Sequence, residues 1–162
     1  MEADERLWGA ESPEEEERYQ EIIRDRVENS PFYMLLGLEV VGLAPGEARI
    51  KLKAGDKLHN TGGIVHGGAI AALADASAGV ALATLIPRGS RRTVTVEQKV
   101  NFMAPVRQGD LTGFGKVVRK GEDIAVSESE VYGEEGNMVA MSMATFMIIK
   151  PSKGSAAEGR SE

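Results

Sequence analysis

The stretch His66-Gly67-Gly68, followed by Asp75, carries the residue types of a reactive site inside an otherwise apolar segment. Asp75 is the only Asp, Glu, Lys or Arg between Leu58 and Pro87. An isolated carboxylate is costly to bury in such a setting, so it needs either a hydrogen-bonding partner or a chemical task. Asp75 is therefore the first candidate catalytic residue.

Gly67 and Gly68 begin the apolar segment, and this start could stabilise a negatively charged oxygen. The first N–H groups of a helix have no acceptor inside it and lie at its positive end. Glycine leaves that backbone open to a substrate. The glycines also fit a simple tight turn, and Asp75 fits a structural carboxylate at a dimer contact. Together they indicate attack on a carbonyl carbon, with Asp75 either as nucleophile or, as we favour, as the base that activates water.

The spacing of Gly67 and Asp75 prevents one helix from supplying both groups to one carbonyl. They are eight residues apart in the sequence, and eight residues span about 12 Å of helix. An oxyanion donor and a base that act on the same carbonyl cannot be much more than about 8 Å apart. A second, antiparallel copy of the helix would bring Asp75 of one subunit to Gly67 of the other. We expect a homodimer with shared sites, further paired into a dimer of dimers (a homotetramer).

Other polar residues near this segment carry less specific expectations. His66 is expected to hold the Gly67 peptide by hydrogen bonding, with general-base catalysis as the alternative. His59, His66 and Asp75 lack a recognised metal-ligand spacing, so neither a metal nor another cofactor is expected. Three arginines crowd the loop after the helix: Arg88, Arg91 and Arg92. They form either a solvated turn or a contact with phosphate groups of a substrate. Gly68 is a further candidate for substrate binding, because it has no side chain and lets a substrate approach the backbone.

Hydrophobic patterning places these residues on a helix that is enclosed by strands. Eight alanines between Ala69 and Ala83 give this helix a thin, nearly all-round apolar surface. Strands are predicted over 38–43 and 47–53 before it, and over 92–103, 110–120, 123–132 and 137–149 after it. The fold class is therefore α+β, with a long central helix wrapped by a curved antiparallel sheet in the order β-β-α-β-β-β-β.

The two ends of the chain differ from its middle. Ser12-Pro13-Glu14-Glu15 predicts the start of a polar helix over residues 13–29, and a short helical turn follows up to Gly37. We assign residues 1–30 to an acidic N-terminal extension, 31–150 to one folded domain and 151–162 to a disordered tail.

Composition excludes several classes of protein. A formal net charge of −6 argues against a nucleic-acid partner. The chain contains no cysteine, which excludes disulfides and thiol catalysis. Its acidic start does not have the form of a secretory signal, and the apolar stretch 67–86 contains Asp75 and three glycines. A cytoplasmic protein without membrane contact is therefore expected.

An ordered set of residues spans the helix and the strand after it. It runs Asn60-x2-Gly63-x2-His66-Gly67-Gly68-x6-Asp75, then Thr93-Val94-Thr95-Val96-Glu97-x2-Val100-Asn101-Phe102-x2-Pro105-Val106-x2-Gly109. This set resembles the hotdog-fold acyl-CoA thioesterases of the PaaI-like, phenylacetic-acid-degradation type, and the similarity covers residues 31–150. The resemblance implies hydrolysis of an acyl-CoA thioester to a free acid and coenzyme A.

The resemblance also implies roles for individual residues. The Gly67 N–H would bind the thioester carbonyl, Asp75 would act as nucleophile or general base, and Asn60 would assist at the carbonyl. Thr95 matches a Ser or Thr that helps to hold the attacking water in some relatives. Many relatives have Lys or Arg after the glycine between the fourth and fifth strands, whereas Glu122 stands there in this chain. A coenzyme A phosphate contact at that turn does not carry over.

Two other functions of this fold fit the sequence less well. A hydroxyacyl dehydratase uses a His with a Glu or Asp, and dehydratases of the fold follow that His with a bulky, proline-containing segment. A non-catalytic acyl-CoA-binding hotdog protein that controls transcription would need a DNA-binding module, for which one acidic helix is too little. The identity of the acyl group is not predicted, because no aromatic cluster or charge defines its pocket.

Overall fold

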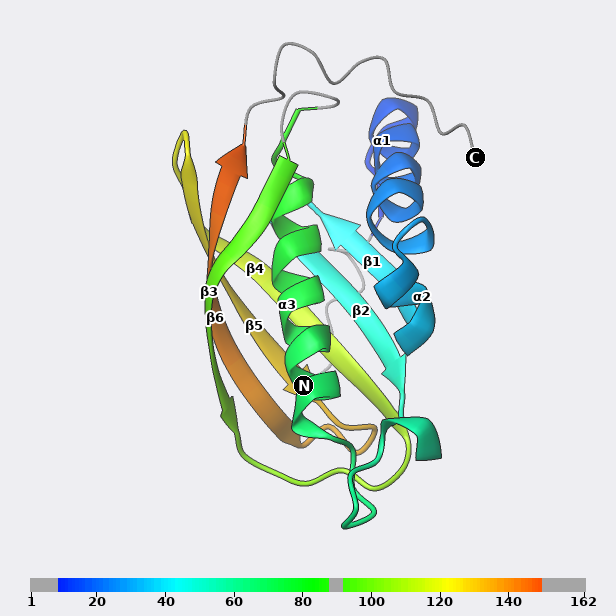
Figure 1. Cartoon of the computed structure of the whole chain (residues 1–162). Coiled ribbons are helices and arrows are strands. Elements are labelled where there is room, and N and C mark those ends of the chain that lie inside the picture. The colour runs from blue at the N-terminus through cyan, green and yellow to red at the C-terminus, as the bar shows by residue number, and fades with distance from the viewer. Residues whose placement is uncertain (1–8, 88–91, 150–162) are drawn as a thin grey trace, which may run out of the picture.

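A long helix lies against a curved, six-stranded antiparallel sheet in the computed structural model, which describes residues 9–87 and 92–149 (Figure 1). The helical segments are α1 (Pro13–Ile23), the π-helical turn η2 (Arg24–Glu28), α2 (Pro31–Leu36), the 3-10 turn η3 (Asp56–Leu58) and α3 (Gly67–Ala83). The strands are β1 (Leu38–Ala44), β2 (Glu47–Lys53), β3 (Arg92–Phe102), β4 (Asp110–Lys120), β5 (Ile124–Tyr132) and β6 (Met138–Ile149). The predicted α+β hotdog architecture and element order are confirmed.

The strand order in the sheet is β1-β2-β4-β5-β6-β3, and every neighbouring pair is antiparallel. β3 therefore forms one edge of the sheet, although it is the strand that directly follows α3. None of its 11 residues is buried. An edge strand of this length presents unpaired backbone groups that favour pairing with another strand.

α3 lies unusually close to the strand β4. The helix buries 11 of its 17 residues, most of them alanines, so it offers a thin surface to the sheet. On β4, Gly113 and Gly115 face Ser77 of the helix, and a methyl group added at Gly115 would overlap the Ser77 carbonyl oxygen. The two glycines therefore set the distance between helix and sheet.

The N-terminal helix packs onto the same core. Ser12 Oγ accepts a hydrogen bond of 3.2 Å from the Glu15 N–H, which caps α1 as predicted. Tyr19, Ile22 and Val27 from α1 and η2 belong to the main hydrophobic cluster. The expected single helix over 13–29 is α1 continued by the π-helical turn η2, a change of winding that the sequence pattern did not predict.

The guanidinium group of Arg18 closes the far end of α3. It donates to the carbonyl oxygens of Thr84 and of Ile86, the latter at 3.1 Å. A cation at this position complements the negative end of the helix. No helix in the described part of the chain is long and apolar enough to cross a membrane. Predictions for residues 1–8, Arg88, Arg91 and the tail 151–162 fall outside the described residues, and the division of the chain at residue 30 stays a prediction.

Candidate active site

Asp75 lies in the middle of α3, half-buried, where the helix approaches the edge strand β3. Thr95 of β3 donates a hydrogen bond of 2.8 Å from its Oγ1 to Asp75 Oδ1. Burial raises the pKa of the Asp75 carboxyl above its ordinary value, and the Thr95 hydrogen bond partly opposes this shift. The pair therefore combines a carboxylate of increased basicity with a hydroxyl that fixes its orientation.

A pocket of about 210 Å³ opens beside Asp75 and Thr95. Its walls come from η2 and α2, from α3 and from the two strands β3 and β6. The lining residues are Arg26, Ser30, Tyr33, Asp75, Gly79, Val80, Thr93, Thr95 and Phe146. Burial and the nearby Asp75 charge raise the pKa of Tyr33 to about 12. The Tyr33 phenol is therefore a hydrogen-bond donor at neutral pH.

The N-terminus of α3 presents free backbone donors at a different place. His66 is the N-cap residue, and its Nδ1 accepts a hydrogen bond of 2.8 Å from the Gly68 N–H. We expected His66 to hold the Gly67 peptide; the side chain reaches the N–H one residue further on, as capping side chains do. The Gly67 N–H has no acceptor in the part of the chain that the structure describes, and it stays available to a ligand.

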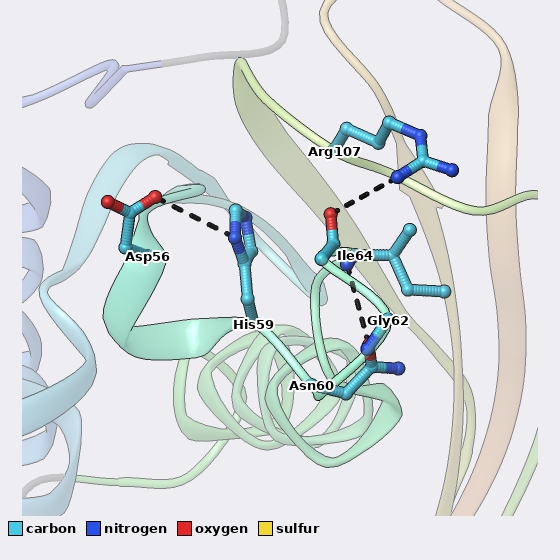
Figure 2. Close-up of polar contacts among 7 residues, drawn as sticks. Asp56, His59, Asn60, Gly62, Ile64 and Arg107 are labelled. Carbon is cyan, nitrogen blue, oxygen red and sulfur yellow. Dashed lines mark hydrogen bonds and ion pairs between the residues drawn. The ribbon is translucent and has the colours of Figure 1, made fainter.

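Asn60 shapes the loop that leads into α3 (Figure 2). Its Oδ1 accepts hydrogen bonds from the Gly62 N–H at 2.8 Å and from the Ile64 N–H at 3.4 Å. Arg107 supports the loop from outside through the Gly63 carbonyl oxygen at 3.5 Å. His59 is at the start of the loop, and its Nδ1 lies 3.7 Å from Oδ1 of Asp56 (Figure 2). The Asn60 side chain thus has a structural task that sequence reasoning missed, while its amide nitrogen remains a donor.

Asn60 and Gly67 line a second pocket of about 300 Å³. The rest of its wall is apolar: Ile64, Val65, Ile70, Phe102, Met103, Ala104 and Pro105. This pocket shares no lining residue with the one beside Asp75. Within one chain the structure therefore brings Asp75 to Thr95 and Gly67 to Asn60, and it does not bring the two pairs together.

The remaining predicted residues are placed as follows. Gly68 is exposed and engaged by His66, and Arg92 is exposed at the first position of β3. Arg26, which lines the Asp75 pocket, was not among the predicted residues. The sequence places Arg26 in an acidic helix whose charged residues are expected to face solvent. Nothing in the local pattern indicates that Arg26 lines the same pocket as Asp75.

Comparison with known proteins identifies the class of protein. A family model described as the thioesterase superfamily matches residues 62–140. A Saccharolobus solfataricus protein that carries the provisional name of an esterase is 31% identical over 118 residues, covering 73% of this chain and 83% of its own length. The chain belongs to the thioesterase superfamily.

Two relatives have names that specify a thioester. The 1,4-dihydroxy-2-naphthoyl-CoA hydrolase of Listeria monocytogenes is 25% identical over 73% of this chain and 95% of its own. The medium/long-chain acyl-CoA thioesterase YigI of Escherichia coli is 26% identical over 75% of this chain and 88% of its own. Both names contain coenzyme A, but the acyl groups differ in shape and polarity.

Solved structures agree with the fold. A thioesterase family protein from Silicibacter pomeroyi superimposes with a TM-score of 0.75 at 26% identity, over 82% of this chain and 99% of that chain. The PaaI protein from the phenylacetic acid degradation operon of E. coli also superimposes with a TM-score of 0.75, over 82% of this chain and 94% of its own. Its identity is 19%, so this likeness supports the shared fold alone.

Proposed function

We propose that the protein hydrolyses acyl-CoA thioesters to a free acid and coenzyme A, at sites that two subunits share. The observation that carries this proposal is the Asp75–Thr95 pair, a half-buried carboxylate held by a 2.8 Å hydrogen bond at the wall of a pocket. The names of two relatives contain coenzyme A, which favours this thiol as the leaving group. Asn60, Gly67 and Thr95 keep the roles that the family resemblance implies, and His66 caps the helix through the Gly68 N–H, as parts of the same proposal.

In the proposed reaction Asp75 acts as a general base. The carboxylate takes a proton from a water molecule as that water attacks the thioester carbon. The carbonyl oxygen becomes an oxyanion, which receives hydrogen bonds from the free Gly67 N–H and from the Asn60 amide nitrogen. The carbon–sulfur bond then breaks, and the coenzyme A thiolate takes the proton from Asp75, which returns the base to its ionised form. Thr95 holds Asp75 and the attacking water in place.

The two halves of this reaction come from different subunits in our proposal. Gly67 and Asp75 are at the start and in the middle of one helix, about 12 Å apart by helix geometry. β3 forms the free sheet edge beside Asp75, and its Val94 and Val96 side chains are 44% and 50% exposed. Pairing of two β3 edges about a two-fold axis would cover these side chains and place two antiparallel α3 helices side by side.

A panel of coenzyme A thioesters, with free thiol as the measured product, tests the proposed function. The wild-type protein should release thiol after dialysis against EDTA, because no step needs a metal. Asp75→Asn preserves the shape of the side chain and should lower kcat by about 10²- to 10⁴-fold. A variant within a few-fold of wild type would show that Asp75 is not the base, and a wild-type protein that hydrolyses no thioester would exclude the function.

A further inference from the structure

Arg26 contributes a positive charge to the wall of the Asp75 pocket. The residue belongs to η2, is half-buried and lines the pocket wall. Its Nη1 donates to Thr93 Oγ1 at 3.2 Å. No Asp or Glu in the described ranges forms an ion pair with it. A guanidinium group has five N–H donors in a planar fork, and the hydrogen bond to Thr93 uses one of them.

The charges around Arg26 leave room for an anion. Burial lowers the pKa of the Arg26 guanidinium, and the neighbouring Arg92 lowers it further, while Tyr33 and Asp25 oppose this. Arginine nevertheless stays cationic at neutral pH. Tyr33 stays protonated and adds a neutral hydroxyl to the same pocket wall. An acceptor-bearing group in this part of the pocket would therefore meet a cation and a hydroxyl donor.

Strand geometry gives the spacing between the two threonines that bind Arg26 and Asp75. Thr93 and Thr95 pair in regular register with Ile148 and Phe146 of β6, so their side chains share one face of β3. Two residues along a strand span about 7 Å. Thr95 binds Asp75 and Thr93 binds Arg26, so the two hydroxyl groups that hold the carboxylate and the guanidinium are about one such step apart.

On the basis of the proposed function, we infer that Arg26 recognises a carboxylate at the far end of the acyl group, so that the preferred substrates are coenzyme A half-thioesters of short dicarboxylic acids. A carboxylate matches the planar guanidinium fork, with which it forms paired, charge-assisted hydrogen bonds. A chain of a few carbons spans the step from the thioester carbon to Arg26. The phosphates of coenzyme A do not fit this position, because the cysteamine, β-alanine and pantoate units separate them from the thioester.

Matched pairs of thioesters test this inference. The pairs are glutaryl-CoA and adipyl-CoA, each compared with the thioester of its monomethyl ester, which has the same chain without the charge. For the better of the two chain lengths, the wild-type kcat/KM should be roughly 10- to 100-fold higher for the free acid. Arg26→Gln should remove this preference, so that the free acid and its methyl ester are hydrolysed with similar kcat/KM.

Arg24→Gln provides a matched control, because Arg24 is exposed on the same turn η2. It should keep the preference for the free acids. A wild-type protein that treats both members of each pair equally, or a preference that survives in Arg26→Gln, would overturn the inference. Thioesters of the same acyl groups with N-acetylcysteamine, which lacks phosphates, provide a further test. If Arg26→Gln lowers hydrolysis only of the coenzyme A thioesters, Arg26 binds a phosphate of coenzyme A rather than the acyl carboxylate.

Binding separates failure of this inference from failure of the proposed function. Titration calorimetry of Asp75→Asn with each pair measures the preference for a free carboxylate without turnover. The Asp75→Asn variant should bind the free acids more tightly than the methyl esters, and adding Arg26→Gln to it should abolish this difference. That result would support the acyl pocket even for a protein that hydrolyses none of these thioesters. Equal affinities would overturn it.

Discussion

Asp75 is held in a position where its ionised form is disfavoured. Burial raises its pKa, and the hydrogen bond from Thr95 opposes this shift. A folded-state pKa above the unfolded value means that the native protein loses stability as pH rises through that folded pKa. A residue that costs stability at neutral pH is expected where the chemistry requires it.

Asp75→Asn should therefore not lower the free energy of unfolding at neutral pH. Asparagine keeps the shape of the side chain and cannot ionise, so the variant escapes the penalty that wild type meets above the folded pKa of Asp75. Urea unfolding at several pH values checks this. The difference in unfolding free energy, variant minus wild type, should be lowest near pH 4 and increase toward pH 7. A difference that instead decreases from pH 4 to pH 7 would show that the ionised carboxylate stabilises the fold.

Thr95→Val should shift the pH dependence of hydrolysis. The Thr95 hydrogen bond lowers the pKa of Asp75, so its removal leaves burial unopposed and raises that pKa. The active carboxylate form then appears only at higher pH. The acidic limb of the kcat/KM profile should move to higher pH, Thr95→Ser should restore it, and an unmoved limb in Thr95→Val would separate Thr95 from the base.

Sequence reasoning reached these residues unevenly. Asp75 could be predicted as a candidate site residue, because a lone carboxylate is costly to bury in an alanine-rich helix. The loop hydrogen bonds of Asn60 depend on a turn that brings Gly62 and Ile64 back to its side chain, and no local pattern encodes that geometry. Arg26 was missed for a related reason, since its place in the pocket wall follows from a hydrogen bond to Thr93, 67 residues further along the chain.

The contact between α3 and β4 sets the thickness of the whole fold. Gly113 and Gly115 lie on the buried face of β4, opposite Ser77 of the helix. Side chains at these two positions would push the helix away from the sheet. Because Asp75 is only two residues from Ser77, its alignment with Thr95 depends on this close approach.

Gly115→Ala should destabilise the protein strongly. Its new methyl group would overlap the backbone of Ser77, and a buried helix cannot retreat without losing its other contacts. We expect a loss of about 3 kcal/mol in unfolding free energy. Gly55→Ala is the control, because its backbone is extended and no atom lies within 4 Å of the added methyl. Equal thermal stability of the two variants would contradict the close packing.

The elements themselves were largely predictable. The strands β2 and β4 have the bounds expected from the sequence, and the ends of the other strands differ by one residue or match. Turn residues such as Gly46, Gly109 and Gly136 adopt positive φ and mark these ends clearly. The π-helical winding at Arg24–Glu28 could not be predicted, because it depends on tertiary contacts of Val27 and Arg26 rather than on local propensity.

On the scale of the whole molecule, mixing two inactive variants tests whether sites are shared. Asp75→Ala disables the base, and Asn60→Ala disables the half-site around Gly67, both as a donor and through the loop. Refolding the two together in equal amounts should give about half heterodimers, in which one site holds both defects and the other holds none. Roughly a quarter of wild-type activity should return.

Separately refolded parents provide the baseline for that experiment. If both groups acted within one chain, every site in the mixture would hold one defect and no activity would appear. Mass spectrometry must show that heterodimers form, so that an inactive mixture counts against the cross-subunit site rather than against refolding.

The N-terminal segment through Leu36 contributes Arg26, Ser30 and Tyr33 to the Asp75 pocket, yet it supplies no strand to the sheet. It also lies outside residues 62–140, the part of the chain that matches the superfamily model and contains Asp75, Gly67 and Thr95. Selection for a different acyl group can therefore act on a segment whose substitutions leave the register of the sheet and the reacting residues unchanged. In such a lineage the reacting residues stay the same while the substrate preference changes.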